Sequence, residues 1–190
     1  MAQSSFNLGK WVLYTGIGWF LGFLLLLLLA DILESVHLDF QFIVGLSMGF
    51  GVGMLQWLLL RKYYTISFNW VVFLIIGMTI PFVIFDIASR YINLSIETSI
   101  LFIVASGTLF SSYLQTNYLL KPINANTKSW IGFSLIGWLS VTVLCMFSYP
   151  ILIHYFTKNV VAIINIIIFT SAGPLLGYIT GKGIKLMLIE

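Results

Sequence analysis

Trp11-Val-Leu-Tyr-Thr-Gly-Ile-Gly-Trp-Phe-Leu-Gly-Phe-Leu-Leu-Leu-Leu-Leu-Leu-Ala30 is a run of 20 residues without a charged side chain. An α-helix rises about 1.5 Å per residue, so about 20 apolar residues cross the roughly 30 Å hydrocarbon core of a bilayer. In hydrocarbon, backbone N–H and C=O groups must bond within the segment, and a helix achieves this. The run therefore predicts a transmembrane helix. It is also longer than the apolar core of a usual cleaved signal peptide.

Five similar apolar segments follow, so we expect six spans in all. They lie at about 10–30, 40–60, 70–86, 98–120, 129–151 and 159–180. The chain is 60% hydrophobic and only 8% charged, against roughly 25% charged residues in a soluble domain. We find no linker and no soluble segment between the spans. The sequence therefore predicts a single all-α transmembrane domain over residues 1–190.

The basic residues predict how the spans are oriented. With the N-terminus in the cytoplasm, the inner loops and ends hold seven of them: Lys10, Arg61, Lys62, Lys121, Lys128, Lys182 and Lys185. The outer side then holds only Arg90 and Lys158. Short loops rich in Lys and Arg stay in the cytoplasm. We therefore expect a protein of the cell (inner) membrane with both termini in the cytoplasm, an arrangement that requires an even number of spans.

A repeated pattern opens each odd-numbered span. A tryptophan precedes a glycine by seven residues at Trp11 and Gly18, at Trp70 and Gly77, and at Trp130 and Gly137. The tryptophans are 59 and 60 positions apart (70 − 11 and 130 − 70), and Gln56 and Gln115 of the even spans are 59 apart (115 − 56). Such periodicity is typical of internal repeats. Chance similarity among apolar helices is the alternative.

We interpret the pattern as three helical hairpins, at about 10–66, 69–124 and 129–186. Each copy contains two spans, so all copies face the same way, as parallel repeats do around an axis along the membrane normal. The simplest arrangement is a pseudo-threefold bundle.

Small residues mark the helix faces that we expect to pack closely, because lipid-embedded helices associate through close van der Waals contact. The second and sixth spans carry glycine at every fourth position: Gly45, Gly49, Gly53, Gly173, Gly177 and Gly181. We therefore predict that the even-numbered spans form the inner contacts of the bundle.

The segments Gly49 to Arg61 and Gly173 to Leu186 carry a family resemblance. A glycine-rich helix, Gln-Trp-x-x-Leu, a short basic turn, and then Trp seven residues before Gly resemble uncharacterised bacterial multi-pass membrane proteins. Pro174 and Lys182 depart from the pattern of the final segment. The resemblance implies a similar topology, and no function comes with it.

Six polar residues within the spans are candidates for a ligand site or polar cavity: Gln56, Ser106, Ser111, Ser112, Gln115 and Asn165. Two interpretations are open for the glutamines, which we place about two turns from the cytoplasmic face. They either lock hairpins together through interhelical hydrogen bonds or form a polar vestibule that faces the cytoplasm.

Other polar and aromatic residues have simpler interpretations. We expect Trp11, Trp70 and Trp130 to be interfacial anchors. We place Asp86, His37 and His154 near the outer boundary of the membrane. The chain contains a single cysteine, Cys145, which excludes an intrachain disulfide. We find no catalytic motif and predict no metal site and no cofactor.

These features favour a non-catalytic scaffold or accessory subunit of a membrane assembly. The alternative is a small-molecule binding or transport protein, similar in size to the vitamin-binding subunits of energy-coupling-factor importers, or an oligomeric pore. The expected partners are the lipid bilayer and other membrane proteins or further copies of this chain. Nucleic acid is not an expected partner, because the basic residues are scattered.

Overall fold

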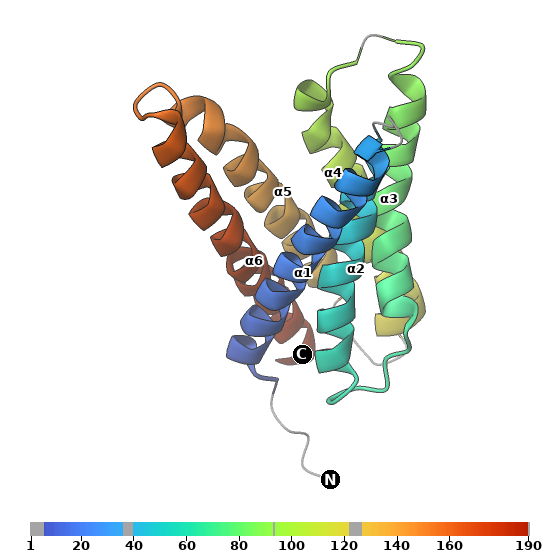
Figure 1. The fold of residues 1–190 in the computed structure, drawn as a ribbon. Helices are drawn as coiled ribbons and strands as arrows, with labels where there is room; N and C mark the ends of the chain where they lie inside the picture. The colour runs from blue at the N-terminus through green and yellow to red at the C-terminus, as the bar shows by residue number, and fades with distance from the viewer. Residues whose placement is uncertain (1–5, 36–39, 93, 122–126, 190) are drawn as a thin grey trace.

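A computed structural model describes residues 6–35, 40–92, 94–121 and 127–189 of the chain. Within these ranges the fold is all helical (Figure 1): α1 (Leu8–Ser35), α2 (Phe42–Leu60), α3 (Asn69–Ala88), α4 (Ile96–Gln115), the short π-helix η1 (Thr116–Leu120), α5 (Thr127–Leu152) and α6 (Lys158–Ile189). Six helices, with η1 continuing α4, are long and apolar enough to cross a membrane. The predicted all-α, six-span class is confirmed, and the chain is a multi-pass membrane protein.

The helix ends differ from the predicted spans by a few residues, except in α6. This helix continues nine residues beyond the predicted end (189 − 180). Lys182 and Lys185 interrupt the apolar run there and are exposed, while Gly183, Ile184 and Met187 between and beyond them are buried in the bundle. The sequence estimate stopped at the charges, whereas the helix continues because its other face is packed.

The six helices form a closed ring in chain order. Each helix packs against the one before it and the one after it, and α6 closes the ring against α1. Among the described residues, no two even-numbered helices pack extensively against each other. The prediction that even-numbered spans form the inner contacts is therefore wrong.

The glycine faces of the even helices pack instead against odd helices of the neighbouring hairpins. Gly45, Gly49 and Gly53 of α2 face α3, and a Cβ atom on Gly49 would lie 3.0 Å from Ile75 Cα. Gly173, Gly177 and Gly181 of α6 face α1, and a Cβ on Gly177 would lie 2.8 Å from Val12 Cα. Glycine permits the backbones to approach this closely. The glycine spacing therefore predicted close packing correctly, but it did not identify the partner helix.

The three glycines of the Trp-to-Gly pattern share one kind of contact. Each packs against the even helix of its own hairpin. A Cβ atom on Gly18 would lie 2.6 Å from Gly51 O, and a Cβ on Gly77 would lie 2.7 Å from Ser111 Cα. A Cβ on Gly137 would lie 3.1 Å from Leu176 Cδ1. The internal repeat and the pseudo-threefold relation remain predictions.

Asp86 connects α3 to the start of α2. Its two carboxylate oxygens accept hydrogen bonds from the backbone N–H groups of Gln41 and Phe42, each at 2.9 Å. The first N–H groups of a helix lack intrahelical partners, and the helix dipole favours a negative charge there. Asp86 therefore caps α2 from a neighbouring helix. Of the other residues placed at this boundary, His154 is exposed, and His37 lies outside the described residues.

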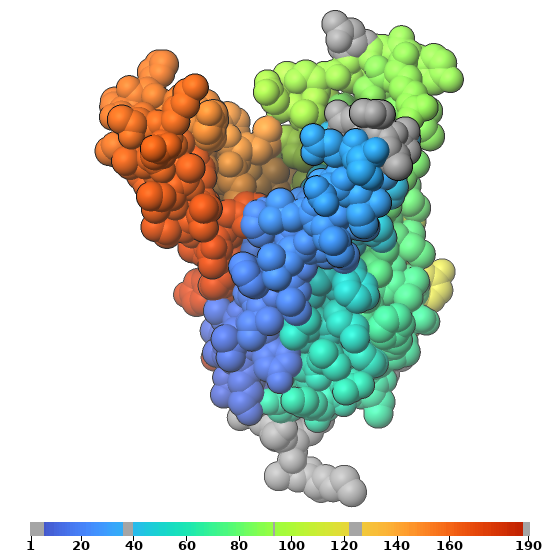
Figure 2. All heavy atoms as spheres, in the orientation of Figure 1, coloured from blue at the N-terminus to red at the C-terminus, as the bar shows by residue number. Residues whose placement is uncertain are grey.

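The start of α1 and the end of α6 lie together at one end of the bundle, which we call the terminal end (Figure 1). Towards the opposite end, the α5–α6 hairpin diverges from the other helices. Figure 2 shows a notch there between this hairpin and the surface formed by α1 and the α3–α4 hairpin. The molecule is therefore closed at the terminal end and open at the other.

Candidate functional site

The three leading tryptophans meet inside the bundle at the terminal end. Trp11 and Trp70 are fully buried, and Trp130 is 3% exposed. The ring of Trp130 lies 6.3 Å from that of Trp11 and 5.1 Å from that of Trp70, measured between centroids. These side chains belong to α1, α3 and α5, which alternate around the ring, so they meet at its centre. Our expectation of interfacial anchors requires correction, because buried rings cannot face lipid headgroups.

Hydrogen bonds connect this tryptophan cluster to the even helices. Trp130 Nε1 donates to Gln115 Oε1 at 3.1 Å, and Gln115 Nε2 donates to the backbone carbonyl of Trp70 at 3.2 Å. Trp11 Nε1 donates to Thr180 Oγ1 at 3.0 Å. The first two bonds tie α5 and α3 to α4, and the third ties α1 to α6. The cluster therefore joins helices from all three hairpins.

Gln56 also bonds within the protein. Its Nε2 donates to Thr15 Oγ1 at 3.3 Å, across the α1–α2 hairpin. Gln56 is 3% and Gln115 1% exposed. Both glutamines therefore make interhelical hydrogen bonds, but only Gln115 connects two hairpins, because the bond of Gln56 stays within the α1–α2 hairpin.

The serine and asparagine candidates bond locally, and only Ser111 and Ser112 lie near a glutamine, one turn before Gln115 on α4. Ser111 and Ser112 are buried, and their hydroxyls donate to the carbonyl of Thr108 at 3.1 and 2.6 Å. Ser106 donates to Ile103 O at 3.0 Å. Asn165 accepts a 2.6 Å bond from Ser148 on α5 and donates to Val161 O. The six candidates do not form one continuous polar stripe.

A cavity of about 130 Å³ lies in the middle of the ring, above the tryptophan cluster and towards the open end. All six helices contribute to its wall, through residues that include Trp19, Met48, Phe82, Val104, Trp138 and Phe169. Among the described residues of this wall, Thr142 supplies the only hydroxyl, and it already donates to the carbonyl of Trp138 at 2.8 Å. Apolar cavities of comparable size stay empty of water and bind small apolar molecules.

A second cavity, of about 370 Å³, adjoins this central cavity. It lies between α1 and the α5–α6 hairpin, and Cys145 and Phe169 line both spaces. Ser148 and Asn165 bring the bonded polar pair to its wall. We call this second space the side opening. It lies in the region where the α5–α6 hairpin diverges from the bundle.

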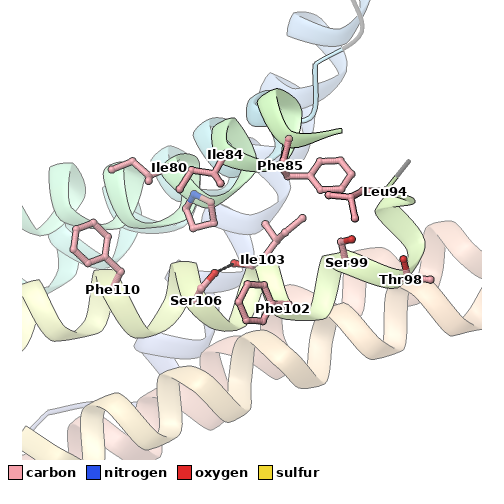
Figure 3. A pocket seen from close by; sticks show the side chains of 12 residues that line it. Ile80, Ile84, Phe85, Leu94, Thr98, Ser99, Phe102, Ile103, Ser106 and Phe110 are labelled. Atoms are coloured by element: carbon pink, nitrogen blue, oxygen red, sulfur yellow. Dashed lines mark hydrogen bonds between the residues drawn. The ribbon is translucent and has the colours of Figure 1, made fainter. Parts of the chain in front are cut away.

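A third space, of about 680 Å³, is a groove between α3 and α4. Figure 3 shows apolar side chains of the two helices facing each other across it, among them Ile84 from α3 and Phe102 from α4. These two side chains are 61% and 77% exposed, so the groove lies on the outer surface of the bundle. Ser106 is the only one of the six polar candidates that lines it.

Sequence reasoning missed the residues of the central cavity. Trp19, Met78 and Trp138 all line it, and each stands eight positions after a leading tryptophan (11 + 8, 70 + 8 and 130 + 8). The repeat pattern therefore contained a relevant spacing. The spacing alone does not show that the helices close into a ring, and this closure brings α1, α3 and α5 to one central space.

No protein-family model, curated protein or solved structure matches this chain. Arguments about its function therefore rest on the geometry described above and on the sequence. The resemblance to uncharacterised multi-pass proteins remains a hypothesis.

Proposed function

We propose that this chain is a non-catalytic membrane protein that acts as a scaffold or accessory subunit of a membrane assembly, with both termini in the cytoplasm of a bacterial cell. The main support is the tryptophan cluster of Trp11, Trp70 and Trp130. These rings fill the centre of the ring of helices at the terminal end, where an aqueous path through one copy of the chain would have to pass. The non-catalytic part rests on the sequence, in which we find no catalytic motif.

The polar side chains support the same proposal. A solute path needs polar groups that face water along its length. In this bundle Gln56 and Gln115 bond to other helices, and Ser111 and Ser112 bond to their own helix. The wall of the central cavity is almost entirely apolar. Such an interior suits packing in lipid better than conduction of a polar solute.

Cysteine accessibility tests for a water-filled path. Cys145 is first replaced (Cys145→Ala), and single cysteines are then introduced as Ser111→Cys and Ser112→Cys, both at positions 1% exposed. We expect both to resist a membrane-impermeant thiol reagent in intact membranes. Gly49 is a poor position for this test, because a Cβ there would lie 3.0 Å from the backbone of Ile75.

The matched control is Lys62→Cys, at an exposed position in the turn that follows α2. It should react with the same reagent in open membrane fragments. Rapid reaction of the two buried cysteines would contradict the proposal and favour a pore or carrier. Native mass spectrometry of gently extracted protein supplies the positive test, since a scaffold should carry other subunits in fixed stoichiometry.

The central cavity favours a second candidate function, the binding of a small molecule. All six helices contribute to its wall, and it adjoins the side opening; ligand sites often lie between the helices of a bundle in this way. Its wall selects for an apolar ligand. In the same mass spectra, a co-purifying small molecule without other subunits would favour this candidate over the scaffold.

A further inference from the structure

We propose that the side opening and the central cavity together bind one acyl chain of a phospholipid, with the end of the chain in the central cavity. This site goes beyond the scaffold function and is independent of it. Two spaces of about 370 and 130 Å³ adjoin, and Cys145 and Phe169 line both. In the proposed site, a guest that enters between α1 and the α5–α6 hairpin passes between Cys145 and Phe169 into the central cavity.

The sizes of the two spaces favour a thin, flexible guest. One turn of an α-helix with its side chains is a cylinder about 10 Å wide and 5.4 Å long, or roughly 420 Å³. The side opening, at about 370 Å³, does not hold even one such turn. The central cavity, at about 130 Å³, is smaller than the roughly 150 Å³ cavity that binds a benzene ring. A hydrocarbon chain fits both spaces, whereas a partner helix or a bulky ring system does not.

The chemistry of the walls agrees with a hydrocarbon chain. Trp19, Trp138 and Phe169 surround the inner space, and the one hydroxyl there is already bonded to a backbone carbonyl. The polar pair of Ser148 and Asn165 lies only in the side opening. The polarity therefore falls from the side opening towards the centre, as it does from the glycerol backbone to the chain end of a lipid.

A positive charge stands on the same helix towards the membrane surface. Lys158 is exposed in the first turn of α6, seven residues before Asn165, or about 10 Å along the helix axis. A lipid whose chain enters beside Asn165 would have its phosphate near this ammonium group and the N-terminus of α6, both of which attract anions. This complementarity favours a phospholipid over a neutral hydrocarbon or a second copy of the apolar chain.

Photo-crosslinking with defined lipids tests the site in the full-length protein. Nanodiscs receive a phosphatidylglycerol that carries a diazirine either at the methyl end of one acyl chain or near its carbonyl group. We expect the methyl-end probe to label peptides that contain Trp138, Cys145 and Phe169, and the carbonyl-end probe to label the region of Asn165. Labelling by the methyl-end probe confined to lipid-facing residues such as Ile163 and Ile167 would overturn the proposal. This test needs no variant.

A pair of matched variants adds a second test. Val141→Phe fills the central cavity, whose wall Val141 forms, while Val143→Phe makes the same change two residues away on an exposed surface. Labelling of the cavity peptides should fall at least tenfold in the first variant and stay unchanged in the second. Equal labelling in both, with both folded by near-ultraviolet circular dichroism, would sink the idea. If Val141→Phe does not fold, Cys145→Phe at the junction of the two spaces replaces it.

The source of the chain is tested in parallel. A free fatty acid with the same methyl-end diazirine is compared with the phospholipid at equal concentration in the bilayer. Stronger labelling by the phospholipid, reduced by Lys158→Gln, is expected. Labelling by the fatty acid alone would overturn the assignment to a phospholipid. Unchanged labelling in Lys158→Gln would show that the Lys158 charge does not bind the lipid, and the assignment to an anionic phospholipid would then be wrong.

Discussion

Gln115 connects two tryptophans of different hairpins through a single side-chain amide. Its Oε1 accepts from Trp130 Nε1, and its Nε2 donates to the carbonyl of Trp70. The variant Gln115→Leu keeps the volume but leaves the Trp130 N–H buried without a partner. Interhelical hydrogen bonds in membranes are worth about 0.6 kcal/mol on average and up to about 1.7. We therefore expect a loss of roughly 1–2 kcal/mol in unfolding free energy, measured by denaturation in mixed micelles.

The matched control for Gln115→Leu is Asn117→Leu, two residues further on. The Asn117 amide is half-buried, and its Nδ2 donates to Tyr113 O within its own helical segment rather than to another hairpin. Its loss should cost less than about 0.5 kcal/mol, as is usual for substitutions near the surface. Equal losses in the two variants would mean that the bonds between hairpins contribute nothing special.

Asp86 gives a second prediction at the residue scale. It caps α2 through both carboxylate oxygens, and removal of a capping side chain typically costs about 1 kcal/mol and at most about 2. We expect Asp86→Ala to lower the unfolding free energy by this amount, whereas Asp86→Asn, which keeps one acceptor oxygen, should lose less. Glu97→Ala, at an exposed position in the first turn of α4, is the control. The same denaturation assay ranks the three, and a loss in Glu97→Ala as large as that in Asp86→Ala would contradict the capping role.

At the scale of elements, the contact between α6 and α1 depends on glycine. A Cβ on Gly177 would lie 2.8 Å from Val12 Cα, which is backbone and cannot rotate away. Gly177→Ala should therefore push the two helices apart and cost about 1–3 kcal/mol, the usual range for overpacking. In Gly132→Ala on α5, the new methyl group meets nothing within 4 Å, so this control should be neutral or slightly stabilising. Thermal unfolding of the two variants in detergent measures the difference, and equal melting temperatures would show that the contact can adapt.

Sequence reasoning predicted the elements better than their contacts. Length and apolar composition suffice for the six helices, because only an internally bonded helix satisfies its backbone in lipid. They do not tell which face of a helix is buried, since lipid tails are as apolar as a protein core. Trp11 illustrates this, because an indole side chain is common at a headgroup interface and also packs well in a buried cluster. The residue type alone does not distinguish the two locations. The glycines of α2 likewise indicated a close contact without showing that α3 makes it.

The central cavity lies beyond the reach of such patterns for a related reason. Its wall takes residues from all six helices, so its position depends on the order in which the helices close the ring. Trp19 and Phe169 are 150 positions apart in the chain and meet only because α6 packs against α1. No local spacing in the sequence contains that contact.

For the whole molecule, orientation in the membrane is the property that the charges predict. Exposed basic residues, among them Lys10, Arg61, Lys62 and Lys182, gather at the terminal end, whereas Arg90 and Lys158 stand at the opposite end. From the positive-inside rule we predict that the tryptophan cluster lies on the cytoplasmic side and that the open side of the bundle faces outward. Two single-cysteine variants in the Cys145→Ala background test this arrangement: Lys62→Cys for the terminal end and Lys158→Cys for the opposite end.

In intact cells, an impermeant thiol reagent should label Lys158→Cys and not Lys62→Cys, and in inverted membrane vesicles the preference should reverse. Each substitution removes a positive charge, so each is repeated with a cysteine at a neutral neighbour, Tyr63→Cys or Thr157→Cys, which leaves the charge balance intact. Labelling of both ends from the same side would contradict a closed six-span topology. The opposite preference would invert the molecule, and the side opening would then draw its acyl chain from the cytoplasmic leaflet, whose anionic lipids Lys158 would meet directly.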